Sequence, residues 1–137
     1  MTELDTLIKN ALQNEGQQQE DVNKVYLALL RTILYIPVEQ ARAKDSEEPF
    51  KPLFAKIEGN YFLPGFDAKE KLEKWAADRL DKINFVELLG RELIAGINEN
   101  VYFCLNIGDK FYKEFSPDEV KRIKMIASRI EQLRRLD

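Results

Sequence analysis

Few side chains in this sequence are suited to covalent or acid–base chemistry. Cys104 is the only cysteine, and the chain contains no histidine. This composition excludes catalytic triads, histidine-activated thiols and histidine-containing metal sites, and a zinc site made of cysteines alone needs several of them. The adjacent carboxylate pairs Glu47-Glu48 and Asp118-Glu119 are the remaining candidates for acid–base work.

These groups lack surroundings that would activate them. Both carboxylate pairs lie in polar stretches, and a carboxyl group shifts its pKa strongly only when it is buried or close to another charge. Cys104 lies between Phe103 and Leu105 in an apolar run, which favours a buried, unreactive thiol. The chain also lacks the common glycine-rich phosphate-binding motifs. We therefore expect no catalytic residues, no cofactor and no metal, and we do not expect an enzyme.

Five residues are candidates for contact with a partner or a ligand. Asn106 and Asp109 follow an apolar strand, and ligands often bind at strand ends in open sheets; a simple turn is the alternative. Trp75 lies on the apolar face of a helix, either in the core or as a partly exposed anchor. Tyr112 belongs to an aromatic group that forms either the edge of the core or a contact patch, and Phe66 is paired with it as a contact residue.

Alternating helices and strands must position these candidates. Apolar residues at helical spacing predict a helix over residues 4–12, followed by a polar break at 14–20 and a second helix that begins at Asp21. The β-branched and aromatic run at 32–38 predicts a strand that Pro37 ends or places at a sheet edge.

A charged loop, a hairpin and a helix follow. Residues 40–51 are expected to form an exposed loop. Residues 53–57 and 61–63 are expected to pair as strands across Glu58-Gly59-Asn60, because Gly and Asn tolerate positive φ, with Pro64-Gly65 closing the second strand. A helix is expected to begin with a capping box, its buried face formed by four residues. The capping pair is Asp67 with Glu70, and the buried face is Leu72, Trp75, Ala76 and Leu80.

The remaining patterns predict two more strands and two more helices. Residues 83–86 are expected to form a strand, and residues 87–95 a short helix that Gly96 ends. The run at 101–107 is typical of an inner strand. Ser-Pro-Asp-Glu then predicts a strong helix start, with Ser116 as the cap and Pro117 at the first position.

Together these patterns predict an α/β (α+β) fold in one domain covering residues 1–137. About five strands are expected in a mixed sheet that about five helices cover, and the longest helix is expected at the C-terminus. Residues 1–20 are expected to form an N-terminal helix and linker, and residues 21–137 the core.

The order of these motifs resembles the SseB protein N-terminal domain family. The phrases that carry the resemblance are LRTILYIPV, PLFAKIEGNYFLPGF, FVELLGRELIAGI and LNIGDKFYKEFSPDEV, together with the helix that ends at Trp75. The resemblance covers residues 22–126. Ile107 stands where the family has the proline of an Asn-Pro-Gly turn, and Gly65 and Asp67 depart from its usual helix start. The resemblance implies little about function, because the family has no established catalytic residues to transfer to this chain.

The charge distribution and the absence of targeting signals limit the expected classes of partner and the expected cellular location. Residues 1–109 carry 13 basic and 19 acidic residues, and residues 110–137 carry 8 basic and 5 acidic residues. The basic excess in the C-terminal segment is too small to indicate nucleic-acid binding. The sequence does not begin like a signal peptide, and no apolar stretch approaches the ~18 residues of a membrane span. We expect a cytoplasmic protein of bacterial type that binds neither membrane nor nucleic acid.

Three functional hypotheses remain open. The leading one is a non-enzymatic protein–protein interaction module that contacts another protein or a second copy of itself. The alternative is a domain that binds a small molecule, such as an amino acid or a related metabolite, at the strand end near Asn106 and Asp109. An enzyme of unrecognised type is the third. An exposed apolar patch favours the first, and a deep pocket with convergent polar groups at that strand end favours the second.

Overall fold

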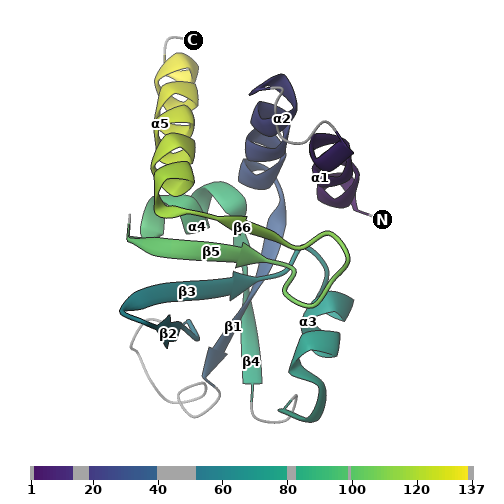
Figure 1. The fold of residues 1–137 in the computed structure, drawn as a ribbon. Coiled ribbons are helices and arrows are strands. Elements are labelled where there is room, and N and C mark those ends of the chain that lie inside the picture. The colour runs from purple at the N-terminus through teal and green to yellow at the C-terminus, as the bar shows by residue number, and fades with distance from the viewer. Residues whose placement is uncertain (1, 14–18, 40–51, 80–82, 99, 136–137) are drawn as a thin grey trace.

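Figure 1 shows the computed structural model of the chain, which describes residues 2–13, 19–39, 52–79, 83–98 and 100–135. The expected loop at 40–51, with its carboxylate pair, and the expected core residue Leu80 lie outside the described residues. Five α-helices and six strands lie within the described part: α1 (Glu3–Gln13), α2 (Gln19–Leu30), β1 (Ile33–Glu39), β2 (Ala55–Ile57), β3 (Asn60–Gly65), α3 (Lys69–Ala76), β4 (Ile83–Leu89), α4 (Gly90–Gly96), β5 (Val101–Leu105), β6 (Lys113–Phe115) and α5 (Pro117–Arg134).

The strands pair in both parallel and antiparallel directions. Four of them form a sheet in the order β2-β3-β5-β6, in which β3 and β5 are parallel and the outer pairs antiparallel; β1 and β4 form an antiparallel pair. Tyr35 and Phe66 exchange two backbone hydrogen bonds of 2.7 and 3.0 Å, which join β1 to the residue after β3. The predicted α+β fold is confirmed, and its strands divide into two sheets because only isolated bridges connect β1 to the larger one.

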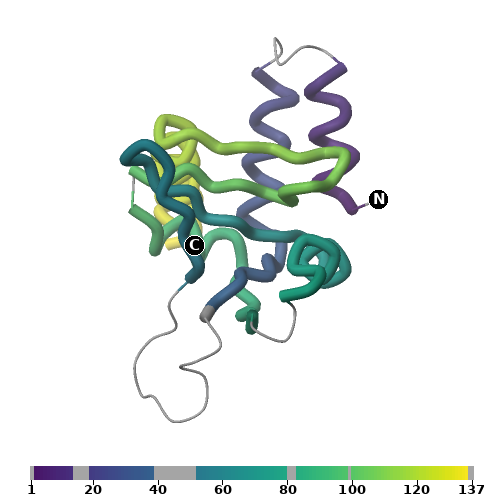
Figure 2. Tube along the Cα trace, turned by 60° about the horizontal axis from the view of Figure 1, so that its bottom comes forward, coloured from purple at the N-terminus to yellow at the C-terminus, as the bar shows by residue number. Residues whose placement is uncertain are grey.

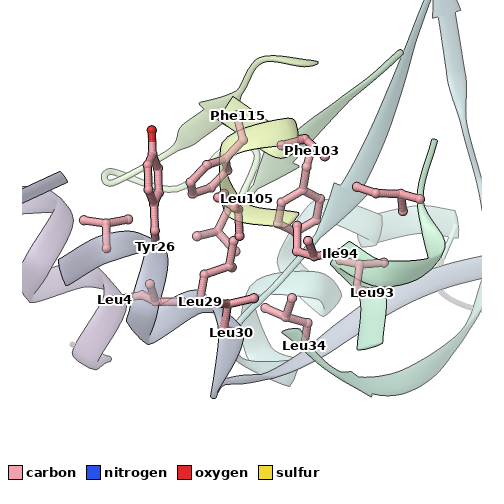
Figure 3. Close-up of a cluster of buried hydrophobic side chains, with 14 of the residues drawn as sticks. Leu4, Tyr26, Leu29, Leu30, Leu34, Leu93, Ile94, Phe103, Leu105 and Phe115 are labelled. Atoms are coloured by element: carbon pink, nitrogen blue, oxygen red, sulfur yellow. The ribbon is translucent and has the colours of Figure 1, made fainter. Parts of the chain in front are cut away.

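The core lies between one face of the four-stranded sheet and the helices. Figure 2 shows α1, α2 and α5 behind this sheet. Side chains alternate along a strand, so Phe103, Leu105 and Phe115 all point to the helix side, where Figure 3 shows them near Tyr26 and Leu29 of α2. All five of these residues are fully or almost fully buried. The strand predicted at 101–107 is therefore an inner strand, and its last sheet residue is Leu105.

The N-terminal helix contributes to the same core. Leu4 and Ile8 of α1 are almost fully buried in the hydrophobic cluster. The expected division of the domain into an N-terminal helix and linker at residues 1–20 and a core at residues 21–137 stays a prediction.

The hairpin turn and the long helix form as their local sequences predict. Glu58 and Gly59 make a two-residue turn with φ of 52° and 84°, a geometry that matches the twist of paired strands. Asn60, expected in the turn with a positive φ, belongs to β3 instead, and Glu58 takes that conformation. At the start of α5, the Ser116 side chain accepts a hydrogen bond from the Glu119 backbone nitrogen, and the Glu119 side chain accepts one from Ser116. The predicted capping box is confirmed.

The predicted capping box at Asp67 is wrong. The N-cap of α3 is Ala68, which makes no side-chain capping bond, and the helix begins at Lys69. The carboxylate of Asp67 instead accepts hydrogen bonds from Lys71 and Thr2. A buried carboxylate gains more from a charged donor than from a backbone N–H, which explains the difference. The neighbouring boundaries also shift, because β3 extends through Gly65 and β4 extends to Leu89.

Replacing Leu105 with alanine is expected to destabilise the protein by about 3 kcal/mol, because it removes a fully buried side chain and leaves a cavity. Urea denaturation followed by circular dichroism measures this loss. Leu133→Ala is the matched control, since this leucine is 58% exposed. A loss below about 1 kcal/mol at Leu105 would show that the site collapses easily.

Candidate functional site

The carboxyl ends of the parallel strands β3 and β5 bring two expected site residues to one place. Asn106 directly follows β5, is completely buried and has a φ of 62°, which Asn tolerates better than most residues. Its Oδ1 atom accepts a hydrogen bond of 3.1 Å from the backbone nitrogen of Asp67, just beyond β3. The backbone nitrogen of Asp109 donates to the Asn106 carbonyl at 3.0 Å, so the segment forms the turn that the sequence predicts.

A charged cluster lies at this end of the sheet. The Nζ atom of Lys71 lies 2.8 Å from carboxylate oxygens of both Asp5 and Asp67, and 3.8 Å from Asp109. The Thr2 hydroxyl donates a further hydrogen bond to Asp67. We call Asp5, Asp67, Lys71 and Asp109 the Lys71 cluster. It fastens α1, α3 and the loop after β5 to one another.

Burial and charge act in opposite directions on this cluster. Burial disfavours the charged carboxylate of Asp5, but hydrogen bonds from Lys71 and Thr2 outweigh it, so the pKa of Asp5 lies below its ordinary value. Burial likewise disfavours the ammonium of Lys71, but its bonds to Asp5 and Asp67 outweigh the penalty and raise the pKa of Lys71. Both groups are therefore held in their charged forms.

Sequence reasoning misses the long-range part of the Lys71 cluster. Asp5 and Lys71 are 66 positions apart, and no periodic pattern connects them. The spacing of four residues between Asp67 and Lys71 is the available local signal. Within the described ranges, no group of three Asp, Glu, Cys or His residues could hold a metal ion.

One atom at this end of the sheet lacks a hydrogen-bonding partner. The Nδ2 atom of Asn106 is buried and makes no hydrogen bond to the described residues. A buried amide donor without an acceptor is costly, so this atom could bind the oxygen of a water or of a ligand.

Phe66 and Trp75 pack against each other beyond β3. Their ring centroids lie 5.4 Å apart. Phe66 is completely buried, so its expected role as a contact residue does not agree with the structure; its ring fixes α3 to the sheet instead. Trp75 is half-buried, and the Arg79 guanidinium lies 4.9 Å from its ring centroid, as in a cation–π contact.

An aromatic surface covers the sheet face that points away from the core. Because side chains alternate, Phe62 and Tyr102 point opposite to Leu63 and Phe103, and their rings stack at 4.8 Å. Ile57 of β2 lies on this same face and is 57% exposed.

Tyr112 extends this surface toward β6. Its hydroxyl donates to Glu114 at 3.3 Å, and Glu114 pairs with Cys104 across β5 and β6. The Tyr112 side chain is 41% exposed. We call Ile57, Phe62, Tyr102 and Tyr112 the outer-face patch.

The single thiol lies beneath the outer-face patch. Cys104 is buried, and burial raises its pKa, although the nearby Tyr112 hydroxyl acts in the opposite direction. Burial and the contact with Cys104 also raise the pKa of Tyr112. The thiol therefore has the protonated, unreactive character that the sequence predicts.

A pocket that the sequence does not reveal lies between α1 and α2. Its volume is about 320 Å³, its walls are mainly apolar, and Tyr26, Lys113 and Glu119 lie at one end. The Tyr26 hydroxyl donates to Glu119 at 2.7 Å, and the Lys113 ammonium lies 3.1 Å from the same carboxylate. These polar groups bind one another and join α2, β6 and α5.

Comparison with known families assigns most of the chain to one domain family. The model of the SseB protein N-terminal domain matches residues 7–122, most of the chain. No curated protein and no solved structure matches this chain. In the described part of the chain, no helix is long and apolar enough to cross a membrane.

Proposed function

The chain belongs to the SseB protein N-terminal domain family, and we propose that it acts as a non-enzymatic protein–protein interaction module. The observation that carries this proposal is the outer-face patch. Four apolar or aromatic side chains gather on a sheet face that the core helices do not cover. Such gathered surfaces mark binding sites more often than single exposed apolar residues do.

The geometry of the outer-face patch suits a protein partner. Aromatic side chains bury much surface at a low cost in conformational entropy, and they are enriched at the centres of protein interfaces. The stacked rings of Phe62 and Tyr102 are already fixed in place, which lowers the cost of binding further. We assign Tyr112 to the contact surface and Trp75 to its edge at the carboxyl end of the strands.

The remaining predicted residues have supporting roles in this proposal. Asp109 holds the loop before Tyr112 through Lys71, and the buried side chains of Phe66 and Asn106 fix the ends of the strands. We also propose a cytoplasmic location, which the one reduced, buried cysteine supports.

The alternative, a small-molecule site, is supported by the unpartnered Nδ2 atom of Asn106. A ligand there would present a carbonyl or carboxylate oxygen to this donor. The neighbouring charges are already paired within the Lys71 cluster, which favours a structural role for this region. A thermal-shift series with free amino acids separates the two functions, because the interaction-module proposal expects no change in melting temperature.

The double variant Ile57→Ala/Tyr112→Ala is expected to reduce capture of the native partner at least about fivefold, because it truncates the two exposed contact residues at the opposite edges of the patch. Cross-linking in the native cell, followed by quantitative mass spectrometry, measures the captured partner. Circular dichroism should remain unchanged, since both side chains are exposed.

Met125→Ala is the matched control, because Met125 is 66% exposed but lies on α5. It should capture the partner as wild type does. Equal capture by the double variant and by wild type would contradict the assignment of the outer-face patch.

A further inference from the structure

A second apolar surface lies on the helix side of the molecule. Figure 1 shows α2 and α5 standing apart above α4. A groove of about 320 Å³ runs between them and is lined by apolar side chains of three elements. These are Leu27 and Leu30 of α2, Leu89 of β4, and Ala127 and Ile130 of α5. We call this surface, together with its charged edge, the α2–α5 groove.

The edge of the groove is positively charged. Arg31, Arg91 and Arg134 line it together with one carboxylate, Glu131. The lining residues therefore carry a net charge of +2, although the whole chain carries −3. Glu131 is itself paired with a further arginine, Arg135, at 3.7 Å, and Arg31 is paired with Glu3 of α1, so the net charge remains +2 when both of these partners are counted. This local reversal of charge favours an acidic partner over a basic one.

The form of the groove indicates a helical occupant. Its walls are two helices that both pack on α4 at the base, and Leu27 is 41% exposed on one wall. An amphipathic helix binds such a groove by its apolar stripe, while residues beside the stripe contact the edges. Guanidinium groups at the edges suit carboxylates, with which they form paired hydrogen bonds.

We propose that the α2–α5 groove binds an amphipathic helix of a partner protein whose apolar stripe is flanked by Asp or Glu. The apolar stripe covers Leu27, Ala127 and Ile130, and the flanking carboxylates pair with Arg91 and Arg134. This surface is separate from the outer-face patch, because the two lie on opposite sides of the four-stranded sheet. The inference therefore stands independently of the proposed function.

A designed peptide tests the proposal. The probe is a labelled helical peptide about as long as α5, with leucines in one stripe and glutamates beside them. One control peptide carries lysines in place of the glutamates, and a second has the same composition with the stripe scrambled. Fluorescence anisotropy with the full chain should show the glutamate peptide binding at least about tenfold more tightly than either control.

A charge exchange provides the decisive comparison. Arg91→Glu/Arg134→Glu should weaken binding of the glutamate peptide at least about tenfold and strengthen binding of the lysine peptide. Both positions lie at exposed helix ends, and circular dichroism checks that the variant folds. The outer-face variant Ile57→Ala/Tyr112→Ala should bind the glutamate peptide as wild type does. Amide chemical shifts of Leu27 and Ala127 should change when this peptide is added.

Four outcomes would overturn the proposal. Equal binding of the glutamate and lysine peptides would contradict the proposed role of charge. Equal binding of the glutamate and scrambled peptides would contradict an amphipathic helix as the occupant. Tighter binding of a single-stranded oligonucleotide, lost in the charge-exchange variant, would assign the surface to nucleic acid. A dimer seen by sedimentation, and dissociated by the same variant, would assign the groove to a second copy of the chain.

Discussion

Gly90→Ala is expected to destabilise the protein by more than about 4 kcal/mol, or to prevent folding, because α4 begins directly against the end of α2. A Cβ atom on Gly90 would lie 1.7 Å from the carbonyl oxygen of Leu29 and 2.7 Å from its carbonyl carbon. Leu29 is completely buried, and Gly90 also donates a backbone hydrogen bond of 2.8 Å to Thr32. Neither backbone can move away without breaking the core packing.

Gly96→Ala is the matched control at the other end of the same helix. A Cβ atom at Gly96 would meet no atom within 4 Å. Alanine favours helix more than glycine, so this change should be neutral or stabilise the protein by up to about 1 kcal/mol. Urea denaturation of both variants measures the difference. A loss below about 1 kcal/mol at Gly90 would show that α2 and α4 can separate without cost.

Lys71→Met is expected to destabilise the protein by about 3–5 kcal/mol at neutral pH, because it leaves buried carboxylates without their cation. Asp5 and Asp67 are almost completely shielded from solvent and both bind the Lys71 ammonium at 2.8 Å. Methionine has a similar length, so the change removes the charge with little loss of volume. Lys74→Met on the exposed side of α3 is the matched control and should change stability by less than about 0.5 kcal/mol.

The effect of Lys71→Met should depend on pH. In wild type, the lowered pKa of Asp5 stabilises the fold fully at pH values above the ordinary pKa of this group, which is 3.8. This stabilisation is lost as the pH falls through the lowered pKa of Asp5. The raised pKa of Lys71 stabilises the fold fully below about 10.5, and this contribution is lost as the pH rises through the raised pKa.

In the Lys71→Met variant, Asp5 keeps its hydrogen bonds to Thr2 but loses the bond and the charge of Lys71, so its pKa rises relative to wild type and acidification should stabilise the variant relative to wild type. Urea denaturation at a series of pH values should therefore show the two proteins converging in acid. A difference that stays constant from pH 7 to pH 4 would mean that these charges do not carry the effect.

Local signals in the sequence predict much of the fold. The capping box at Ser116 and Glu119 needs only residues three positions apart, and the hairpin needs only a turn in which Gly59 accepts a positive φ. The inner strand at β5 is an apolar run between polar segments. Each of these features depends on nearest neighbours in the chain.

Features that depend on distant residues are not predictable in the same way. Asp67 has the sequence of a helix cap, but Thr2 and Lys71 bind its carboxylate, and Thr2 comes from the other end of the chain. The sequence suggests Phe66 as a contact residue, but in the structure its ring is completely buried and packs against Trp75. The α2–α5 groove lies between two helices that both pack on α4, an arrangement that their individual apolar patterns do not specify.

The parallel pairing of β3 with β5 has a consequence for synthesis of the chain. Tyr61 pairs with Val101, and α3, β4 and α4 lie between the two strands in the sequence. The β2–β3 hairpin therefore leaves the ribosome well before its partner strand, and an isolated hairpin is only marginally stable in water. During this interval Leu63 of β3, which is completely buried in the folded protein, lacks its neighbour Phe103 of β5. We expect this hairpin to be the segment that chaperones contact on the nascent chain, until β5 emerges and closes the sheet.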